Sequence, residues 1–253
     1  MRIAGRILAL LPVLLTGCVE APEKQYAQRI ELVNETLAKL NSTDPCCKDL
    51  QHATIHGQWP TVMSHVQVGD GSDVGVFGSD KVYFVGLELP AELPSRHLLI
   101  KERYVIKRRD PHAPATILSS LPGVGSAYIM QPHLAFLDTD HQLISEATAP
   151  VCLDQGWDRE RTGFFAAATA PSNAKYVIVF TRPVPENAGL YHKYSGGGGT
   201  VGFSFTYSGT MKVYFGPSGD LDIGIVNDAQ LNSLRGSRDQ ECAEVLAAWG
   251  YRQ

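Results

Sequence analysis

His52 and His56 have the spacing in this chain that comes closest to a metal-binding pair. On a helix, residues four apart lie on the same face, and two histidines placed in this way can bind one zinc ion. A zinc peptidase also needs a glutamate directly after the first histidine to act on the metal-bound water, and Ala53 occupies that position. We therefore predict no metal site, and the sequence indicates no other cofactor.

The sequence provides only weak support for catalysis by a serine nucleophile or by a pair of carboxylates. Ser172 and Lys175 match an S-x-x-K pattern, but no Lys-Thr-Gly segment accompanies it, and no G-x-S-x-G turn is present. Asp138, Asp140 and His141 could bind a cation or a sugar hydroxyl, although an Asp-Thr-Asp segment is typical of a turn. We predict no catalytic residues. The less favoured alternative is a glycan or cell-wall hydrolase, which needs two carboxylates facing each other in a cleft.

Residues 194–200, YSGGGGT, invite comparison with a phosphate-binding loop. Gly197, Gly199 and Gly202 satisfy the G-x-G-x-x-G pattern, which binds phosphate only between a strand and the start of a helix. The residues after Gly202 alternate as in a strand, so we do not predict nucleotide binding. We interpret the glycine run as a loop that could cover the edge of a ligand.

The N-terminus carries the most specific signal. Arg2 and Arg6 precede an apolar run over 7–15, which is typical of a secretory signal peptide and far below the ~20 residues that cross a bilayer. The run ends in Leu-Thr-Gly-Cys18, which resembles a bacterial lipobox. In such proteins the thiol receives a diacylglycerol, cleavage follows, and the new amine is acylated. We predict a signal peptide over 1–17 and a lipid anchor on Cys18, and the alternative is a plain signal peptide with a chance cysteine.

Val19, rather than aspartate, follows the cysteine, which in lipoproteins indicates the outer membrane with the body facing the periplasm. Cys46, Cys47, Cys152 and Cys242 then remain, an even number that suits this oxidising compartment. Because the eight-membered ring of a bridge between neighbours strains the peptide, we expect Cys46 and Cys47 each to pair with Cys152 or Cys242. Buried free thiols are the alternative.

Composition predicts a folded chain. The 253 residues are 44% hydrophobic and 19% charged, which suits one large β domain or two small ones. The formal net charge of −4 gives no general attraction to nucleic acid. The 24 glycines and 15 prolines indicate many turns and few long helices.

Residues 22–40 predict an amphipathic helix. Its apolar residues recur every three or four positions and form one stripe: Tyr26, Ile30, Val33, Leu37 and Leu40. We expect this stripe to dock on the body of the same protein, and a partner helix is the alternative. Near the other end, Asn227 or Asp228 can cap a short helix, and a second helix is expected over 237–249.

Alternating β-rich segments fill the middle of the chain. They cover residues 81–89, 97–106, 133–138, 175–181, 201–207, 211–215 and 220–226. Ser208-Gly209 has the composition of a hairpin turn. Lys101, Arg103, Lys107 and Arg109 lie on one face of the strand expected here, and we expect them to guard an exposed sheet edge, with contact to anionic lipid or glycan as the alternative.

These segments predict a mainly β fold, an antiparallel β-sandwich with flanking N- and C-terminal helices. We assign residues 18–50 to a tether and the amphipathic helix. The sandwich domain is expected over 51–226, and a helical segment packed on it over 227–253.

Three segments resemble the maltose operon periplasmic protein (MalM) family. They are PHLAFLDTDHQLI at 132–144, AKYVIVFT at 174–181, and GTMKVYFGPSGDLDI at 209–223, the last following YHKYSGGGGT at 191–200. The resemblance covers about residues 75–225, and the four body cysteines and the helix over 22–40 depart from it. It implies an envelope accessory protein linked to carbohydrate uptake, without established catalytic residues.

We therefore expect a lipid-anchored periplasmic accessory protein that binds or scaffolds, around a maltodextrin-like glycan according to the resemblance. Sugar sites stack aromatic rings on apolar sugar faces. The candidate ligand-binding residues are Trp59, Trp157, Tyr191 and Tyr194. The alternative is an envelope-assembly lipoprotein that binds another envelope protein through an exposed apolar patch, such as the Tyr26–Leu40 stripe.

Overall fold

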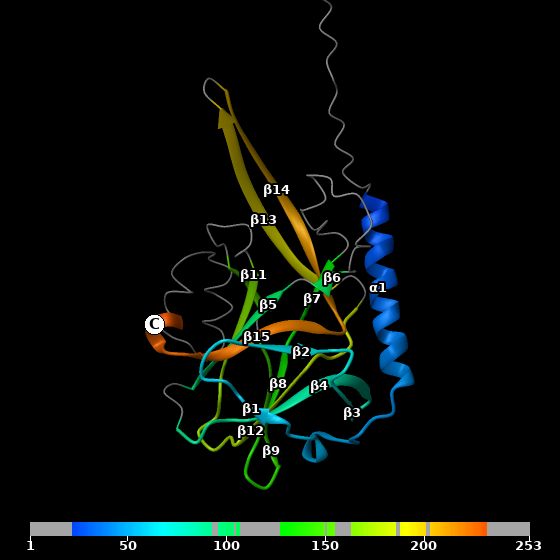
Figure 1. Ribbon diagram of the computed structural model, residues 1–253, viewed down its shortest axis with the longest axis vertical. Helices are drawn as coiled ribbons and strands as arrows, with labels where there is room; N and C mark the ends of the chain where they lie inside the picture. The colour runs from blue at the N-terminus through cyan, green and yellow to red at the C-terminus, as the bar shows by residue number, and fades with distance from the viewer. Residues whose placement is uncertain are drawn as a thin grey trace, which may run out of the picture.

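The alternating segments of the sequence form strands, and the protein is mainly β, as predicted (Figure 1). The computed structural model describes residues 22–92, 96–103, 105–106, 127–149, 151–154, 163–185, 188–200 and 203–231. The described residues include the α-helix α1 (Pro22–Ser42) and the short 3-10 helix η1 (Leu50–His52), and residues 228–231 form a helical turn. The strands are β1 (Gly57–Gln58), β2 (Ser64–Val68), β3 (Asp73–Phe77), β4 (Asp80–Glu88), β5 (His97–Arg103), β6 (Val105–Ile106), β7 (Ala127–Met130), β8 (His133–Leu137), β9 (Leu143–Thr148), β10 (Val151–Asp154), β11 (Gly163–Thr169), β12 (Tyr176–Phe180), β13 (Gly189–Thr200), β14 (Phe203–Gly216) and β15 (Gly219–Val226).

The first sheet has six strands. Its order is β1-β4-β12-β8-β9, and β3 also pairs with β4. The β1–β4 pair is parallel and the others are antiparallel. The central strand β12 buries every residue from Val177 to Phe180, because both faces of this sheet are covered.

The second sheet has five antiparallel strands in the order β10-β11-β5-β15-β2. β5 lies in the middle of this sheet, so the prediction that the basic residues of 101–103 guard a sheet edge is wrong. Instead, Arg103 Nη2 lies 2.6 Å from Asp222 Oδ2 on the neighbouring strand β15.

The first two sheets pack face to face as a sandwich. One core cluster contains Leu134 and Phe136 from the first sheet together with Leu98 and Ile100 from the second. Each of these side chains is at most 1% exposed. Residues two apart on a strand share a face, so the alternation seen in the sequence places these side chains inside.

The third sheet is dominated by a long two-stranded ribbon, β13 and β14, that extends away from the sandwich (Figure 1). Its order is β13-β14-β7-β6. Ser208 and Gly209 pair with Ser195 and Tyr194 inside the ribbon, so the predicted hairpin turn is wrong. The glycines at 196–199 also lie within β13, which corrects the interpretation of this run as a loop.

The outer face of the first sheet is covered by the segment over 46–55. Cys47 and Ala53 pack there against Phe84 and Phe180 in a second core cluster. An ideal Cβ on Gly86 would lie 2.1 Å from Thr54 O, so only glycine allows this close approach of the backbone.

The outer face of the second sheet is covered by the helical turn at 228–231. Asn227 caps this turn, as predicted, because its Oδ1 accepts a 2.8 Å hydrogen bond from Gln230 N. Gln230 Oε1 in turn accepts from Asn227 N at 3.0 Å, which completes a reciprocal capping box. Leu231 then packs on Leu99 and Phe165.

Cys46 and Cys47 form a disulfide with each other. The expected pairing of these two residues with Cys152 or Cys242 is therefore wrong. The backbone of Cys152 lies in β10 opposite Phe165, and Cys242 lies outside the described residues. Hydrogen bonds from Cys46 N to Val74 O and from Val76 N to Cys47 O hold the pair against β3, which allows the chain to accommodate adjacent bonded cysteines.

Candidate functional site

Helix α1 runs along one side of the body, as the apolar stripe in its sequence predicts (Figure 1). The stripe is incompletely buried. Leu40 is 4% exposed, whereas Leu37 is 38% and Tyr26 is 44% exposed. The stripe is therefore buried unevenly, fully at Leu40 and only in part at Leu37 and Tyr26, although it is directed at the body.

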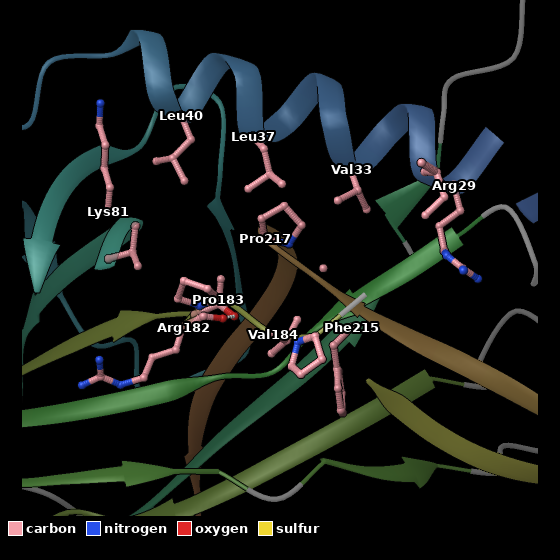
Figure 2. Close-up of a pocket in the computed structure, with 15 residues that line it drawn as sticks. Arg29, Val33, Leu37, Leu40, Lys81, Arg182, Pro183, Val184, Phe215 and Pro217 are labelled. Atoms are coloured by element: carbon pink, nitrogen blue, oxygen red, sulfur yellow. Dashed lines mark hydrogen bonds between the residues drawn. The ribbon is translucent and has the colours of Figure 1, made fainter. Parts of the chain in front are cut away.

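A pocket lies between α1 and the body. Figure 2 shows Val33, Leu37 and Leu40 pointing from the helix toward Val184 and Phe215. The cavity has a volume of about 120 Å³. The remaining lining residues are Arg29, Ile30, Lys81, Val82, Thr181, Arg182, Pro183, Pro185, Gly216 and Pro217. Most of these lining residues are apolar, and none of the described residues that line the pocket is acidic.

Polar contacts hold α1 around the pocket. Thr36 Oγ1 lies 3.4 Å from the buried hydroxyl of Tyr128, which is also 2.6 Å from Ser218 Oγ. Burial raises the pKa of Tyr128, and its contacts with Ser218 and Thr36 only partly oppose this. At the helix C-terminus, Lys81 Nζ donates a 2.9 Å hydrogen bond to Asn41 O. These contacts fix the helix while leaving the apolar space between them open.

Arg29 closes one end of the pocket. Its side chain is buried, with the residue only 2% exposed, and its guanidinium lies 3.2 Å from the centre of the Tyr214 ring. This stacking is a cation–π contact. Arg29 Nη2 is buried and has no hydrogen-bond partner among the described residues. At this end of the pocket, stacking on the Tyr214 ring stabilises the positive charge of Arg29.

Arg182 lies at the opposite side of the pocket, and its charge is compensated. Its Nη1 is 3.1 Å from Asp80 Oδ2, and its Nη2 is 2.6 Å from Glu146 Oε1. Burial alone lowers the pKa of Arg182, but the bonds and charges of Glu146 and Asp80 outweigh burial and raise it. Figure 2 shows the guanidinium directed away from the helix, so only the stem of this residue contributes to the pocket.

The sequence placed ligand binding on four aromatic residues, and one of these assignments is wrong. Trp59 is 1% exposed, belongs to the sandwich core, and donates a 3.0 Å hydrogen bond from Nε1 to Gly224 O. It presents no face on which a sugar could stack. Trp157 lies outside the described residues. Tyr191 and Tyr194 are described only through their backbone pairing in β13, so their roles stay predictions.

The polar clusters found in the sequence form local structure. Asp138 Oδ1 accepts hydrogen bonds from Asp140 N and Gln142 N, both at 2.9 Å, which confirms the turn. His52 and His56 do not share a helix face; each bonds a different carboxylate, Asp49 and Asp73, at 2.6 Å. Within the described part of the chain, no group of three or more potential ligands could hold a metal ion.

The sequence reading missed the body side of the pocket. Its lining comes from residues 181–185, which follow β12 and contain Pro183 and Pro185, and from residues 215–217, where β14 ends and Pro217 follows. A proline-rich strand end has no free N–H to extend a sheet, so it offers an apolar surface to another element. The available signals were these prolines and the apolar stripe of residues 26–40, which was expected to dock on the body, but the segments of the body that it meets depend on the fold.

Comparisons with protein-family models, with curated proteins and with solved structures found no match. The resemblance to the maltose operon periplasmic protein family therefore stays a prediction. In the described ranges, no helix has both the length and the apolar character that a membrane span requires. Cys18, the predicted site of lipidation, lies outside these ranges.

Proposed function

We propose that this protein is a non-catalytic binding or scaffolding lipoprotein of the bacterial envelope, anchored through Cys18 in the outer membrane and facing the periplasm. We further propose that its binding site is the pocket beneath α1, which accepts an apolar group of an envelope partner. The observation that supports this binding site most directly is the incompletely buried apolar stripe of α1, which faces a cavity of about 120 Å³.

The chemistry of the pocket supports an apolar occupant. An engineered apolar cavity of about 150 Å³ in another protein stays dry and binds benzene, so a space of this size can receive one apolar side chain or ring. A sugar needs hydrogen-bonding groups for its hydroxyls. Beyond the charged groups of Arg29, Lys81 and Arg182, Thr181 is the one hydroxyl among the described lining residues, and Phe215 is the one aromatic ring. The glycan role therefore rests on the resemblance alone.

The position of α1 also supports a scaffolding role. The helix begins at Pro22, four residues after the predicted lipidated cysteine, and its C-terminal end packs on the body. A partner that inserts an apolar group beneath the helix would therefore bind close to the anchor. This arrangement suits a protein that presents or holds another envelope component at the membrane surface.

The pocket is tested by thermal unfolding of the purified mature protein with benzene as the probe. A ligand that binds only the native state raises Tm with its concentration. We expect benzene to raise the Tm of the wild type and to have little effect on Val33→Phe, whose ring fills the cavity. Val62→Phe is the matched control, because Val62 is 71% exposed and does not line the pocket.

Maltoheptaose, tested in the same way, separates the two binding roles. A rise in Tm with maltoheptaose that is equal in the wild type and Val33→Phe, without any response to benzene, would contradict the pocket and favour the glycan role. The anchor is tested separately by mass spectrometry of Cys18 and by cell fractionation. We expect a triacylated Cys18, and release of Cys18→Ser from the membrane fraction.

A further inference from the structure

The disulfide between Cys46 and Cys47 has one accessible end and one buried end. Cys46 is exposed, whereas Cys47 is 3% exposed and packs in the second core cluster. The backbone of both residues is fixed on β3, because Cys47 also forms a parallel bridge with Gly75. A thiol arriving from solution can therefore reach the bond only through the Cys46 side.

Polar side chains surround the accessible end. The hydroxyl of Thr54 lies 3.9 Å from Cys46 Sγ and donates a hydrogen bond to Asp73 Oδ2. The same carboxylate oxygen lies 2.6 Å from Nε2 of His56, so the negative charge of Asp73 already has two polar partners. The disulfide therefore borders a hydroxyl that can turn its proton toward the sulfur.

This group is held by the sheet. Thr54 O approaches β4 closely at Gly86, and His56 N donates a 3.0 Å hydrogen bond to Gly86 O. Asp73 is the first residue of β3, the strand that also holds the two cysteines. The disulfide and its polar neighbours are thus positioned by two paired strands, which favours a site of defined geometry.

We propose that Cys46–Cys47 is a thiol–disulfide exchange site that accepts two electrons from a dithiol reductant. The first thiolate of the reductant attacks Cys46 Sγ, the Cys46–Cys47 bond breaks, and Cys47 leaves as a thiolate and takes the proton of the second reductant thiol. That second sulfur, now a thiolate, attacks the reductant sulfur bound to Cys46. The dithiol becomes a disulfide, and Cys46 leaves as a thiolate that is protonated by water.

Thr54 assists the second step. Exchange rates depend on access to the sulfur and on the stability of the leaving thiolate. As Cys46 leaves, the Thr54 hydroxyl rotates from Asp73 to the sulfur and stabilises the thiolate by one hydrogen bond. The disulfide does not line the pocket beneath α1, so the outcome of the experiments on thiol–disulfide exchange is independent of the binding function proposed above.

Peptide mapping under non-reducing conditions tests whether the bond exists in the folded protein. Protein secreted to an oxidising compartment is trapped with iodoacetamide in acid and digested. We expect one peptide that carries both Cys46 and Cys47, lighter by two hydrogens than its reduced form. Cross-links from either residue to Cys152 or Cys242, or two alkylated thiols, would overturn the proposal.

Reduction kinetics test the exchange itself. The folded protein is incubated with dithiothreitol, and alkylation of Cys46 and Cys47 is followed while circular dichroism monitors the fold. We expect Cys46 to become alkylated while the fold is retained, and the buried Cys47 to become alkylated only when denaturant is added after an acid quench. The mixed disulfide between Cys46 and dithiothreitol, followed by mass spectrometry after the same quench, should decay about fivefold more slowly in Thr54→Val, the effect of about one lost hydrogen bond, and Thr54→Ser should restore the rate.

Thr61→Val is the control for kinetics, because Thr61 is exposed and has no contact with this group among the described interactions. Reduction that requires denaturant would overturn the exchange site, because it would show that the sulfur is inaccessible in the native state. Equal rates for Thr54→Val and Thr61→Val would overturn the role of the hydroxyl.

Discussion

The space between the two sheets and the space beneath α1 are both lined by apolar side chains, but they are packed differently. In the sandwich, Leu134, Phe136 and Ile100 are at most 1% exposed and belong to one continuous cluster. Beneath α1, Leu37 keeps 38% of its surface exposed and a cavity of about 120 Å³ remains. The same residue types thus form a closed core in one place and an open pocket in the other.

The difference follows from how each surface is completed. Each sheet of the sandwich brings a row of alternating side chains to the other, so the two rows interdigitate. Helix α1 instead lies over proline-rich strand ends and is supported at its rim by polar contacts such as Thr36–Tyr128. Stability should therefore reside mainly in the sandwich, and the pocket should tolerate substitutions that the core does not.

The largest expected effect is in the sandwich core. Phe136→Ala should lower the free energy of unfolding by about 3–5 kcal/mol, because it removes a buried ring and leaves a cavity. Val33→Ala, on the pocket side of α1, should cost about 1 kcal/mol or less, since Val33 is only half-buried. Urea unfolding of the two variants measures the difference, and equal losses would contradict the comparison.

Two leucines one turn apart on α1 refine this contrast. Leu40 is 4% exposed, so Leu40→Ala should cost about 2–3 kcal/mol. Leu37 is 38% exposed, and the same truncation there should cost about 1 kcal/mol or less. The two variants share the same substitution on the same helix. A larger loss for Leu37→Ala in urea unfolding would show that the pocket is closed in solution.

The sandwich core has one exception to its close packing of apolar groups. Glu102 on β5 is 2% exposed, and its carboxylate oxygens meet no full hydrogen-bond geometry with the described residues, although the backbone N–H of Met130 is near them. Burial raises the pKa of Glu102 well above its usual value, and the backbone of Met130 only partly opposes this, so the folded protein binds this proton more tightly than the unfolded chain does. The unfolded chain releases the proton near the ordinary carboxyl pKa. This group therefore makes the protein less stable as pH rises above that value.

Glu102→Gln should stabilise the protein by about 1–2 kcal/mol at pH 7, because glutamine fills the same space without a titrating group. The gain should grow with pH above the ordinary carboxyl pKa, since only the wild type loses stability there. Urea unfolding at several pH values measures it. A difference that stays constant with pH would show that Glu102 is ionised in the folded protein.

Local patterns predicted most of the secondary structure. The stripe at three- and four-residue spacing predicted α1, and the β-rich runs over 133–138 and 175–181 predicted β8 and β12. The cap at Asn227 was also visible, because its bonds join residues three apart. Each of these features is set by interactions between residues that are close together in the sequence, so the local pattern of residue types reveals it.

Features that depend on the partner strand could not be predicted in this way. Ser208-Gly209 has a turn composition, yet both residues pair across the ribbon with β13, whose glycine run adopts an extended conformation. β5 is basic enough for an edge but lies at the centre of its sheet. The pairing of Cys46 with Cys47 and the burial of Trp59 likewise depend on contacts with β3, β4 and β15 that sequence spacing does not reveal.

The smallest expected effect concerns the ion pair at the end of α1. Lys39 Nζ lies 2.6 Å from Asp70 Oδ2, but both side chains are largely exposed, at 60% and 68%. Water and salt screen such pairs, and holding two long side chains in one geometry costs conformational entropy, so surface pairs contribute little. The hydrogen bond and charge of Asp70 raise the pKa of Lys39, so the pair is attractive, but its exposure makes its contribution to the fold small.

We therefore expect Lys39→Ala to unfold in urea at the same midpoint as the wild type, at low and high salt, while Leu40→Ala at the next position does not. A large, salt-dependent loss in Lys39→Ala would mean that charge, rather than the apolar contact of Leu40, attaches the helix to the body.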